Sequence, residues 1–417
     1  MKIIKRDAYL KKLTDRKENG SIKVITGIRR CGKSYLLFHI YKEYLLSQGV
    51  DPSHIIEIPL DDDNNEYLRD RKELSRYIRE NTDDDNIYYV FLDEIQFCDG
   101  FEGVLNGLLR QENLDIYVTG SNSKFLSSDV LTEFRGRGDE VRVYPLSFSE
   151  FSSAYDGEVM DAWREYMIYG GMPLIMSRKT DEQKTKYLID LFKNVYVKDV
   201  IDRNHLQEDN VFEDVVNILA SSVGSLTNAS KLANTFISKG IKTSDKTITS
   251  YISYLMDAFL IEKAERYDVK GRKYIGSPQK YYYVDVGLRN ARLNFRQQEP
   301  THLMENIIYN ELLVRGYNVD VGVVEKPYRD ENGRQKKSKL EIDFVCNQSD
   351  RRYYIQSAFS IPDTEKLLQE TESFNRLDDS FRKIVVVGDY IKPWFNDKGY
   401  LIMGVIDFLL DANSLDY

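Results

Sequence analysis

Apolar and polar positions in the first 150 residues form two alternating kinds of stretch. Short apolar or alternating runs occur at 22–25, 54–60, 87–92, 116–118 and 141–144. The stretches between them, such as 35–47 and 67–80, carry apolar residues three and four positions apart. Short runs predict buried strands, and the wider spacing predicts helices that pack on a sheet by one face. We therefore expect an α/β fold with a parallel sheet.

The rest of the chain is predicted to be helical at first and then mixed. Helical patterns occur between 162 and 202, at 212–222, 227–236 and 244–258, and a strand pair follows. After Thr301 we expect a helix at 302–315 and then strands at 317–324, 340–346 and 352–357. A further helix and a strand at 383–387 follow. A chain of 417 residues exceeds one core. We expect boundaries near residues 155, 204 and 285, which give four parts at 1–155, 156–204, 205–285 and 286–417.

The strand at 22–25 leads into a phosphate-binding loop. Residues 27–34 read GIRRCGKS and fit G-x-x-x-x-G-K-[ST] at every fixed position. Glycines let backbone N–H groups turn inward around a phosphate, and the following helix points its positive end at the same anion. Lys33 should reach the β- and γ-phosphates of ATP, and the Ser34 hydroxyl should bind Mg²⁺. The nucleotide-binding residues are expected to be Gly27, Ile28, Arg29, Arg30, Cys31, Gly32, Lys33, Ser34 and Tyr35.

Two carboxylates follow the apolar strand at 87–92 directly. Asp93 and Glu94 would lie at the carboxyl edge of the sheet, where open α/β folds bind ligands. We expect Asp93 to hold the Mg²⁺ shell through water and Glu94 to act as general base on the attacking water. The strand at 116–118 ends in the small polar residues 119–122, which either contact the γ-phosphate or are structural. Two arginines, Arg135 and Arg137, precede the last strand, and an arginine can stabilise transition-state charge.

The order GIRRCGKS, YYVFLDEIQ, VTGSN, FRGRG and VYPLSFSEF resembles the predicted bacterial and archaeal ATPases of the AAA+ superfamily whose C-terminal half is uncharacterised. The cluster YGGMP at 169–173 is also typical of that family and is a helix-break signal in its own right. The resemblance implies an AAA+ core with a helical lid, with Ser121, or failing that Asn122, as the sensor. It also implies Arg137 as arginine finger, with Arg135 second, and it favours a homo-oligomer.

The part at 205–285 resembles a winged helix-turn-helix, with three short helices and a strand pair. Its ten basic and ten acidic residues balance. The third helix offers only Lys246 near its start, whereas the wing carries Lys270, Arg272, Lys273 and Lys280 around Tyr274. Such a mix can hold the phosphate backbone of double-stranded DNA. Contact with DNA stays open beside the alternative that this part contacts a protein partner or is only a scaffold.

The part at 286–417 is similar to the PD-(D/E)XK nuclease fold, with Glu305, Asp343 and Gln356 at the helix and strand positions of the motif. That chemistry needs a lysine two residues after Gln356, where this chain has Ala358. We therefore expect a nuclease-like domain without nuclease activity, with an active DNA nuclease as the less favoured alternative. The turn before Asp343 is basic, and it either grips a nucleic-acid backbone or is a solvated loop.

Composition limits the classes of partner and the cellular compartment that are expected for this chain. Net charge is −9, which excludes a uniformly basic surface for nucleic acid or anionic membrane. Three distant cysteines without C-x-x-C spacing indicate neither a disulfide framework nor a zinc site. No apolar run is long enough for a membrane span, so a cytoplasmic protein is expected. The sequence predicts a Mg²⁺-dependent ATPase whose nucleotide state acts on its C-terminal domains, with a slow nucleotide-gated switch for a protein partner as the alternative.

Overall fold

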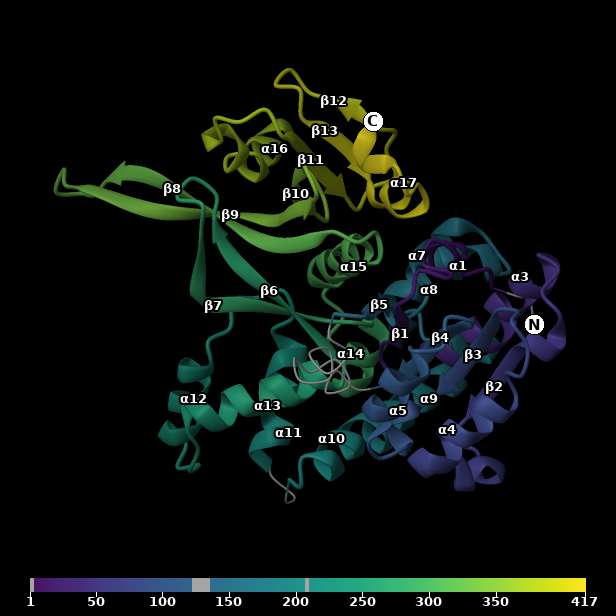
Figure 1. The fold of residues 1–417 in the computed structure, drawn as a ribbon. Helices are drawn as coiled ribbons and strands as arrows, with labels where there is room; N and C mark the ends of the chain where they lie inside the picture. Colours follow the sequence, from purple (N-terminus) through teal and green to yellow (C-terminus); the bar gives the residue numbers. More distant parts are fainter. Residues whose placement is uncertain (1–3, 122–135, 207–209) are drawn as a thin grey trace. The chain divides into compact units, whose positions relative to one another are not determined.

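The computed structural model describes residues 4–121, 136–206 and 210–417. The chain divides into two compact units (Figure 1). The first consists of Met1–Pro145 together with Asp257–Phe259, and the second of Leu146–Met256 together with Leu260–Tyr417. The predicted lid helices, at 162–202, therefore group with the C-terminal half of the chain.

The first unit is built on a five-stranded sheet in which every pairing is parallel. The strand order is β2-β3-β4-β1-β5. The strands are β1 (Ile22–Thr26), β2 (Ile55–Pro59), β3 (Tyr88–Asp93), β4 (Leu114–Gly120) and β5 (Gly138–Arg142). The predicted parallel α/β fold is confirmed for this unit. Because all five strands point the same way, the segments that follow β1, β3 and β4 meet at one edge of the sheet.

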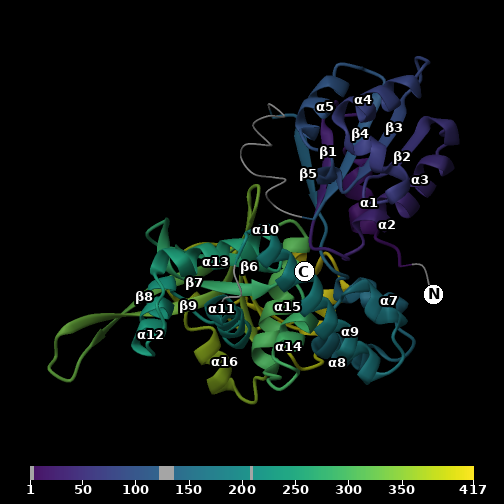
Figure 2. The ribbon, with the colours of Figure 1, turned by 90° about the horizontal axis from the view of Figure 1, so that it is seen from below.

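Helices cover both faces of this sheet (Figure 2). On one face, apolar residues of the strands form a core with α4 (Arg71–Glu80) and α5 (Phe101–Leu108). On the other, the rings of Phe91 and Tyr117 contact the ring of Tyr41 in tilted arrangements. Tyr41 belongs to a helical stretch made of α2 (Lys33–Tyr35), the π-helical Leu36–Tyr41 and α3 (Lys42–Ser47). The helix α1 (Asp7–Thr14) precedes β1, and short 3-10 turns lie at Pro52–His54, Asp63–Arg69 and Ile95–Phe97.

The second unit begins with helices. They are α7 (Phe148–Ala154), α8 (Val159–Tyr169), α9 (Asp181–Leu191), a π-helical Phe192–Val197, α10 (Lys198–Arg203), α11 (Asn210–Ser221), α12 (Ala229–Ser238) and α13 (Asp245–Asp257). The predicted break at the glycine pair is present: α8 ends at Tyr169, and Gly170 has a φ of 68°. The Gly171 N–H donates to the Asp285 carboxylate at 2.6 Å, which fixes this turn. A 3-10 turn, Pro173–Ser177, follows.

An eight-stranded sheet forms the rest of this unit, in the order β12-β13-β11-β10-β9-β8-β6-β7. Its strands are β6 (Ile261–Asp268), β7 (Lys273–Tyr283), β8 (Asn318–Arg329), β9 (Gln335–Gln348), β10 (Arg351–Ala358), β11 (Arg382–Val387), β12 (Trp394–Phe395) and β13 (Leu401–Gly404). The remaining helices are α14 (Val286–Arg292), α15 (Pro300–Val314), α16 (Thr364–Glu370) and α17 (Val405–Leu410). Short 3-10 turns lie at Phe374–Arg376 and Ser414–Asp416.

Two features of this sheet differ from the expectation. The strand pair predicted as a wing, β6 and β7, is not a separate hairpin, because β6 also pairs in parallel with β8. The sheet therefore runs through the boundary expected near residue 285. The predicted basic turn before Asp343 is also mostly strand: pairing of β8 with β9 continues out to Arg329 and Gln335. The sequence pattern did not predict this continuation of the strands, because their residues are charged rather than apolar once the two strands extend beyond the core.

Candidate nucleotide-binding site

The loop after β1 has the backbone that its glycines permit. Gly27 and Gly32 have φ values of 142° and 100°. A Cβ on Gly27 would lie 2.1 Å from the carbonyl oxygen of Val143, so a side chain at this position would clash with backbone. Glycine is therefore required at Gly27 by close approach as well as by φ.

Lys33 begins the helix that follows the loop. Its side chain is buried, and Nζ donates to the carbonyl oxygens of Gly27 and Ile28 at 3.0 and 3.3 Å. The Lys33 ammonium thus contacts the backbone of the phosphate loop. An anionic phosphate oxygen is a stronger partner for an ammonium than a neutral carbonyl, so a bound phosphate would compete for it at this place.

Asp93 ends β3 beside the phosphate loop. It is 4% exposed, and its carboxylate accepts hydrogen bonds from the hydroxyls of Thr119 and Ser34. Burial raises the pKa of Asp93, and the two hydroxyls act in the opposite direction. The two residues predicted to hold Mg²⁺, Ser34 and Asp93, are therefore in direct contact. Thr119 links Asp93 to its neighbour, because the same Oγ1 accepts from the Glu94 N–H at 3.0 Å.

Glu94 follows in a left-handed conformation, with a φ of 48°. Its carboxylate accepts from the Ser121 hydroxyl at 3.2 Å and from the amide of Gln96. Ser121 is buried at the end of β4. The structure therefore brings Lys33, Ser34, Asp93, Glu94 and Ser121 to the same sheet edge. Asn122 and Arg135 lie outside the described residues.

Arg137 lies at the opposite edge. It directly precedes β5, and its carbonyl accepts from the Ile22 N–H at the start of β1. The phosphate loop follows the other end of β1, a strand of five residues, or about 17 Å, away. The sequence places Arg137 before β5, but only the parallel pairing of β5 with β1 shows that this end lies at the sheet edge away from the phosphate loop. Arg137 therefore does not lie at the phosphate loop of its own chain.

Arg6 supports the loop, and the sequence gave no sign of it. Arg6 directly precedes α1, and its side chain is buried, at 4% exposed. Its guanidinium donates to the carbonyl oxygens of Cys31 at 3.0 Å and Tyr144 at 2.7 Å. Cys31 itself is fully buried, and its Sγ lies 3.5 Å from the carbonyl oxygen of Val143. Only the tertiary contact between residues 138 positions apart brings Arg6 here.

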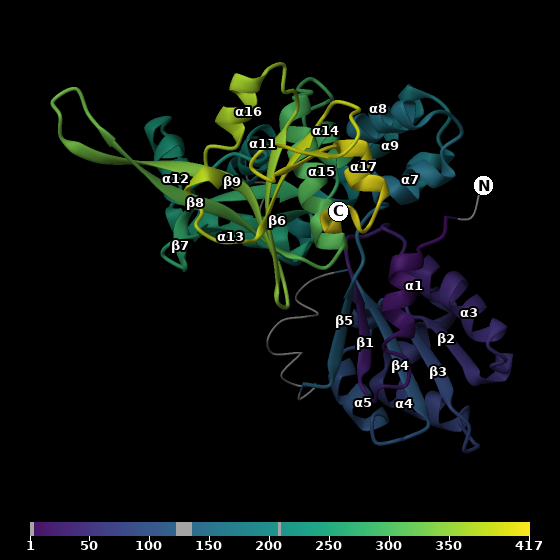
Figure 3. The ribbon, with the colours of Figure 1, turned by 90° about the horizontal axis from the view of Figure 1, so that it is seen from above.

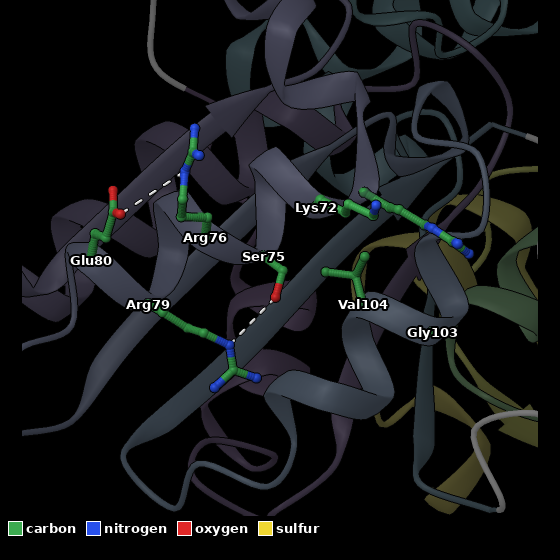
Figure 4. A pocket seen from close by; sticks show the side chains of 8 residues that line it. Lys72, Ser75, Arg76, Arg79, Glu80, Gly103 and Val104 are labelled. Atoms are coloured by element: carbon green, nitrogen blue, oxygen red, sulfur yellow. Dashed lines mark hydrogen bonds and ion pairs between the residues drawn. The ribbon is translucent and has the colours of Figure 1, made fainter.

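A pocket of about 600 Å³ lies elsewhere in the first unit, between α4 and α5 (Figure 4). Its lining is basic, but Arg76 pairs with Glu80 and Arg79 donates to Ser75 on the same helix. Neither the phosphate loop nor Asp93 lines it. The pocket is therefore separate from the predicted nucleotide site.

A second group of carboxylates lies in the other unit, where the nuclease-like motif was predicted. Glu305 of α15, Glu341 and Asp343 of β9 surround the ammonium of Lys280 from β7. The Nζ atom lies 2.8 Å from a carboxylate oxygen of each glutamate and 3.9 Å from one of Asp343. Burial raises the pKa of Asp343, and the charge of Glu305 raises it further. The Lys280 side chain is 5% exposed.

The lysine missing at Ala358 thus has a counterpart from another strand. Lys280 was expected to belong to a basic wing that could hold a phosphate backbone, whereas the structure places its ammonium in this buried cluster. Within the parts of the chain that are described, no group of three or more acidic, histidine or cysteine side chains is suited to a metal ion. The described helices also include none with the length and apolar character needed to cross a membrane.

Comparisons with known proteins agree with the first site. Residues 19–152 match a family described as an AAA domain, and residues 160–299 match a domain of unknown function (DUF8612). The fold and the site define the first unit as a nucleotide-binding AAA+ ATPase domain. The winged-helix and nuclease-like assignments of the C-terminal half find no support in these matches and stay predictions.

Two relatives match nearly the whole chain. An uncharacterised protein of Haemophilus influenzae is 34% identical over 415 residues, covering 98% of this chain and 99% of the relative. The uncharacterised protein MJ1544 of Methanocaldococcus jannaschii is 27% identical over 427 residues, covering 96% and 89%. The chain belongs to the same family as the Haemophilus protein.

Two solved structures are similar to parts of the chain. Aeropyrum pernix ORC1 in complex with DNA has 14% identity and a TM-score of 0.29, covering 70% of this chain and 92% of that one. Cdc6p from Pyrobaculum aerophilum has 11% identity and a TM-score of 0.31, covering 72% and 96%. With scores this low, the class of the first unit rests on its AAA match and on the site.

Proposed function

We propose that this protein hydrolyses ATP with Mg²⁺ at the edge of the first sheet. The observation that carries the proposal is the contact of Ser34 with Asp93 beside the phosphate loop. A hydroxyl and a carboxylate from two separate motifs meet where a phosphate-bound Mg²⁺ would need them.

The site suits Mg²⁺ held by phosphate, because the ion usually keeps several waters and takes few ligands from the protein. Ser34 would bind it directly, and Asp93 through water. The ion would supply charge neutralisation between the β- and γ-phosphates. A bound cation would also offset the burial that raises the pKa of Asp93.

The other groups then have separate tasks. Lys33 moves from the loop carbonyls to the γ-phosphate, and residues 27–35 hold the phosphates with their N–H groups. Glu94 accepts the proton of the attacking water, and Ser121 orients the Glu94 carboxylate through the hydrogen bond between them. Arg137 would act as an arginine finger on a neighbouring subunit's nucleotide, which makes a homo-oligomer part of the proposal. Nucleotide state is then passed to the C-terminal unit and its partners.

The test measures ATP binding and turnover separately in wild type, Lys33→Ala and Glu94→Gln. We expect Lys33→Ala to lose both. Glu94→Gln should bind ATP and lose at least 100-fold in turnover, since a general base contributes that much. Glu102→Gln, an acidic residue on the first turn of α5, is the matched control and should leave both unchanged. Wild type that neither binds nor hydrolyses ATP would refute the proposal.

A slow nucleotide-gated switch remains the second candidate. Lys33 already has partners in the loop, so nucleotide binding exchanges one set of contacts for another and favours two distinct loop states. Turnover well below about 1 per second, with ATP retained after gel filtration, would favour the switch. Nuclease activity is not proposed, because Lys280 occupies the centre of the carboxylate cluster that a metal would need.

A further inference from the structure

The strands β8 and β9 continue together beyond the body of their sheet (Figures 1 and 3). At this end, Val324 of β8 and Ile342 of β9 are the last residues of their strands that belong to the buried core cluster. From Glu325 to Lys339 the side chains are exposed or half-buried, while strand pairing persists to Arg329 and Gln335. Five further residues in each strand extend the ribbon by about 17 Å. We name residues 325–339 the ribbon.

The ribbon is basic in an acidic protein. It holds six cations, at 326, 329, 334, 336, 337 and 339, against three acids, at 325, 330 and 331, or +3, whereas the whole chain is −9. The ribbon has no apolar face, so it buries little apolar surface and contributes little to the stability of the fold. Its positive charge and its extension beyond the sheet therefore indicate a role in binding.

The two faces of the ribbon differ in how their charges are satisfied. Lys326 and Lys336 lie on one face, opposite Ser338 and Tyr328, and both are ion-paired, to Glu372 and Asp330. The other face carries Arg329, Lys337 and Lys339, of which Lys337 pairs with Glu325 at 2.5 Å. Arg329 and Lys339 make no ion pair with any described residue, and neither does Arg334 in the turn. We call this second face the open face.

We propose that the ribbon is a binding arm for double-stranded DNA, with the open face and Arg334 against the phosphates. The DNA major groove is about 12 Å wide and admits a two-stranded β-ribbon. Arg329, Lys339 and Arg334 make no ion pair with any described residue, and the one acidic side chain of the open face, Glu325, is paired with Lys337. The three cations on this face and at the tip are therefore available to closely spaced phosphates. The proposal does not depend on ATP hydrolysis.

The choice of duplex DNA over other polyanions follows from shape. The major groove of duplex RNA is deep and narrow, so a ribbon cannot enter it. A flat basic surface would be enough to bind an acidic protein, whereas this ribbon projects beyond its sheet and can enter a groove. Phosphate contacts carry no base readout, so we expect binding without strong sequence preference.

The experiment is fluorescence anisotropy of a labelled 20-base-pair DNA duplex with the full chain, titrated from low to moderate salt. The test variant is Arg329→Gln with Lys339→Gln. The control is Lys326→Gln with Lys336→Gln, which removes the same charge from the ion-paired face. We expect at least a tenfold loss of affinity in the test variant, with the salt slope reduced by about 2, and a clearly smaller loss in the control.

Several results would overturn the arm. The first is an absence of duplex DNA binding at low salt, which would leave an acidic protein as the partner class. The second is an equal loss of affinity in both double variants, and the third is an equal affinity for duplex RNA. Thermal midpoints should be unchanged in both variants, because all four side chains are exposed or half-buried. Binding by Lys33→Ala at wild-type affinity would show that the arm stands even if the ATPase proposal fails.

Discussion

The two carboxylate sites of this protein differ in what neutralises them. The carboxylates of Asp93 and Glu94 accept hydrogen bonds from hydroxyls and a side-chain amide, none of which carries a positive charge. Glu305, Glu341 and Asp343 surround an ammonium supplied by the same chain. The first arrangement leaves charge for an external cation to balance, and the second brings its own.

This difference explains why only one of the two motifs carries a proposal of chemistry. A site that must bind a cation reversibly cannot also hold a permanent one at its centre. The ammonium of Lys280 occupies the place that a metal ion would take among these carboxylates. Its ion pairs instead connect β7 with α15 and β9.

The largest effect is expected from Lys280→Met. Removing the ammonium leaves three carboxylates close together and largely buried, and breaking a buried ion pair by removing one partner costs about 3–5 kcal/mol. Urea unfolding measures it. The matched control is Lys263→Met, whose partly exposed pair with Glu265 should contribute no more than about 1 kcal/mol. Similar losses in the two variants would contradict a special role for Lys280.

Asp93→Asn should break the other site. We expect Mg²⁺-dependent ATP turnover to fall at least 100-fold, because the substitution removes the negative charge through which the ion's water shell is held. ATPase assays across a Mg²⁺ titration measure it. Asp99→Asn, nearby in the chain but outside the site, is the control. Turnover within threefold of wild type would show that Asp93 is structural.

Lys280→Ala should exchange the internal cation for an external one. Wild-type unfolding in the absence of nucleotide should not respond to Mn²⁺ or to a chelator. The variant, with space and three carboxylates, should be stabilised by millimolar Mn²⁺, following RT ln(1 + [L]/Kd). Denaturation with and without Mn²⁺ measures it. A wild type stabilised as strongly as the variant would mean that Lys280 does not fill a cation site.

The pH dependence of stability should report on the second site. The pKa of Asp343 is raised in the folded protein, so the folded state binds its proton more tightly than the unfolded state. Stability from this group is therefore present at low pH and lost as pH rises from about 4 through the raised pKa. Asp343→Asn should remove that loss, so the cost of the substitution should shrink between pH 5 and 9. Asp378→Asn, at an exposed ion pair with Lys270, should show no such trend.

The smallest effect concerns Arg6→Gln. The guanidinium fixes the loop from behind through two carbonyl oxygens, and losing charged hydrogen bonds of this kind should weaken ATP binding by roughly tenfold. Isothermal titration calorimetry measures the affinity. Lys5→Gln, an exposed neighbour, is the control. An unchanged Kd would show that the loop keeps its form without Arg6.

Local sequence determined the first site well. Strand, glycine loop and helix are consecutive, so the spacing of residues 22–37 alone fixes the loop, and the all-parallel sheet brings Asp93, Glu94 and Ser121 to it. The AAA match confirms the class that this spacing predicted. The order of three helices and two strands after residue 210 was also predicted correctly, and the winged helix-turn-helix that they were expected to form stays a prediction.

Tertiary structure decided what depends on partners distant in sequence. Lys280 joins Glu305 and Asp343 only because β7, α15 and β9 pack together, and Arg6 reaches the loop only through the packing of the first unit. The parallel pairing of β5 with β1 decides that Arg137 lies at the sheet edge away from the phosphate loop. The sequence determines which groups can be charged and which turns need glycine. Strand pairing decides which charges meet, because that depends on register between segments that no local pattern connects.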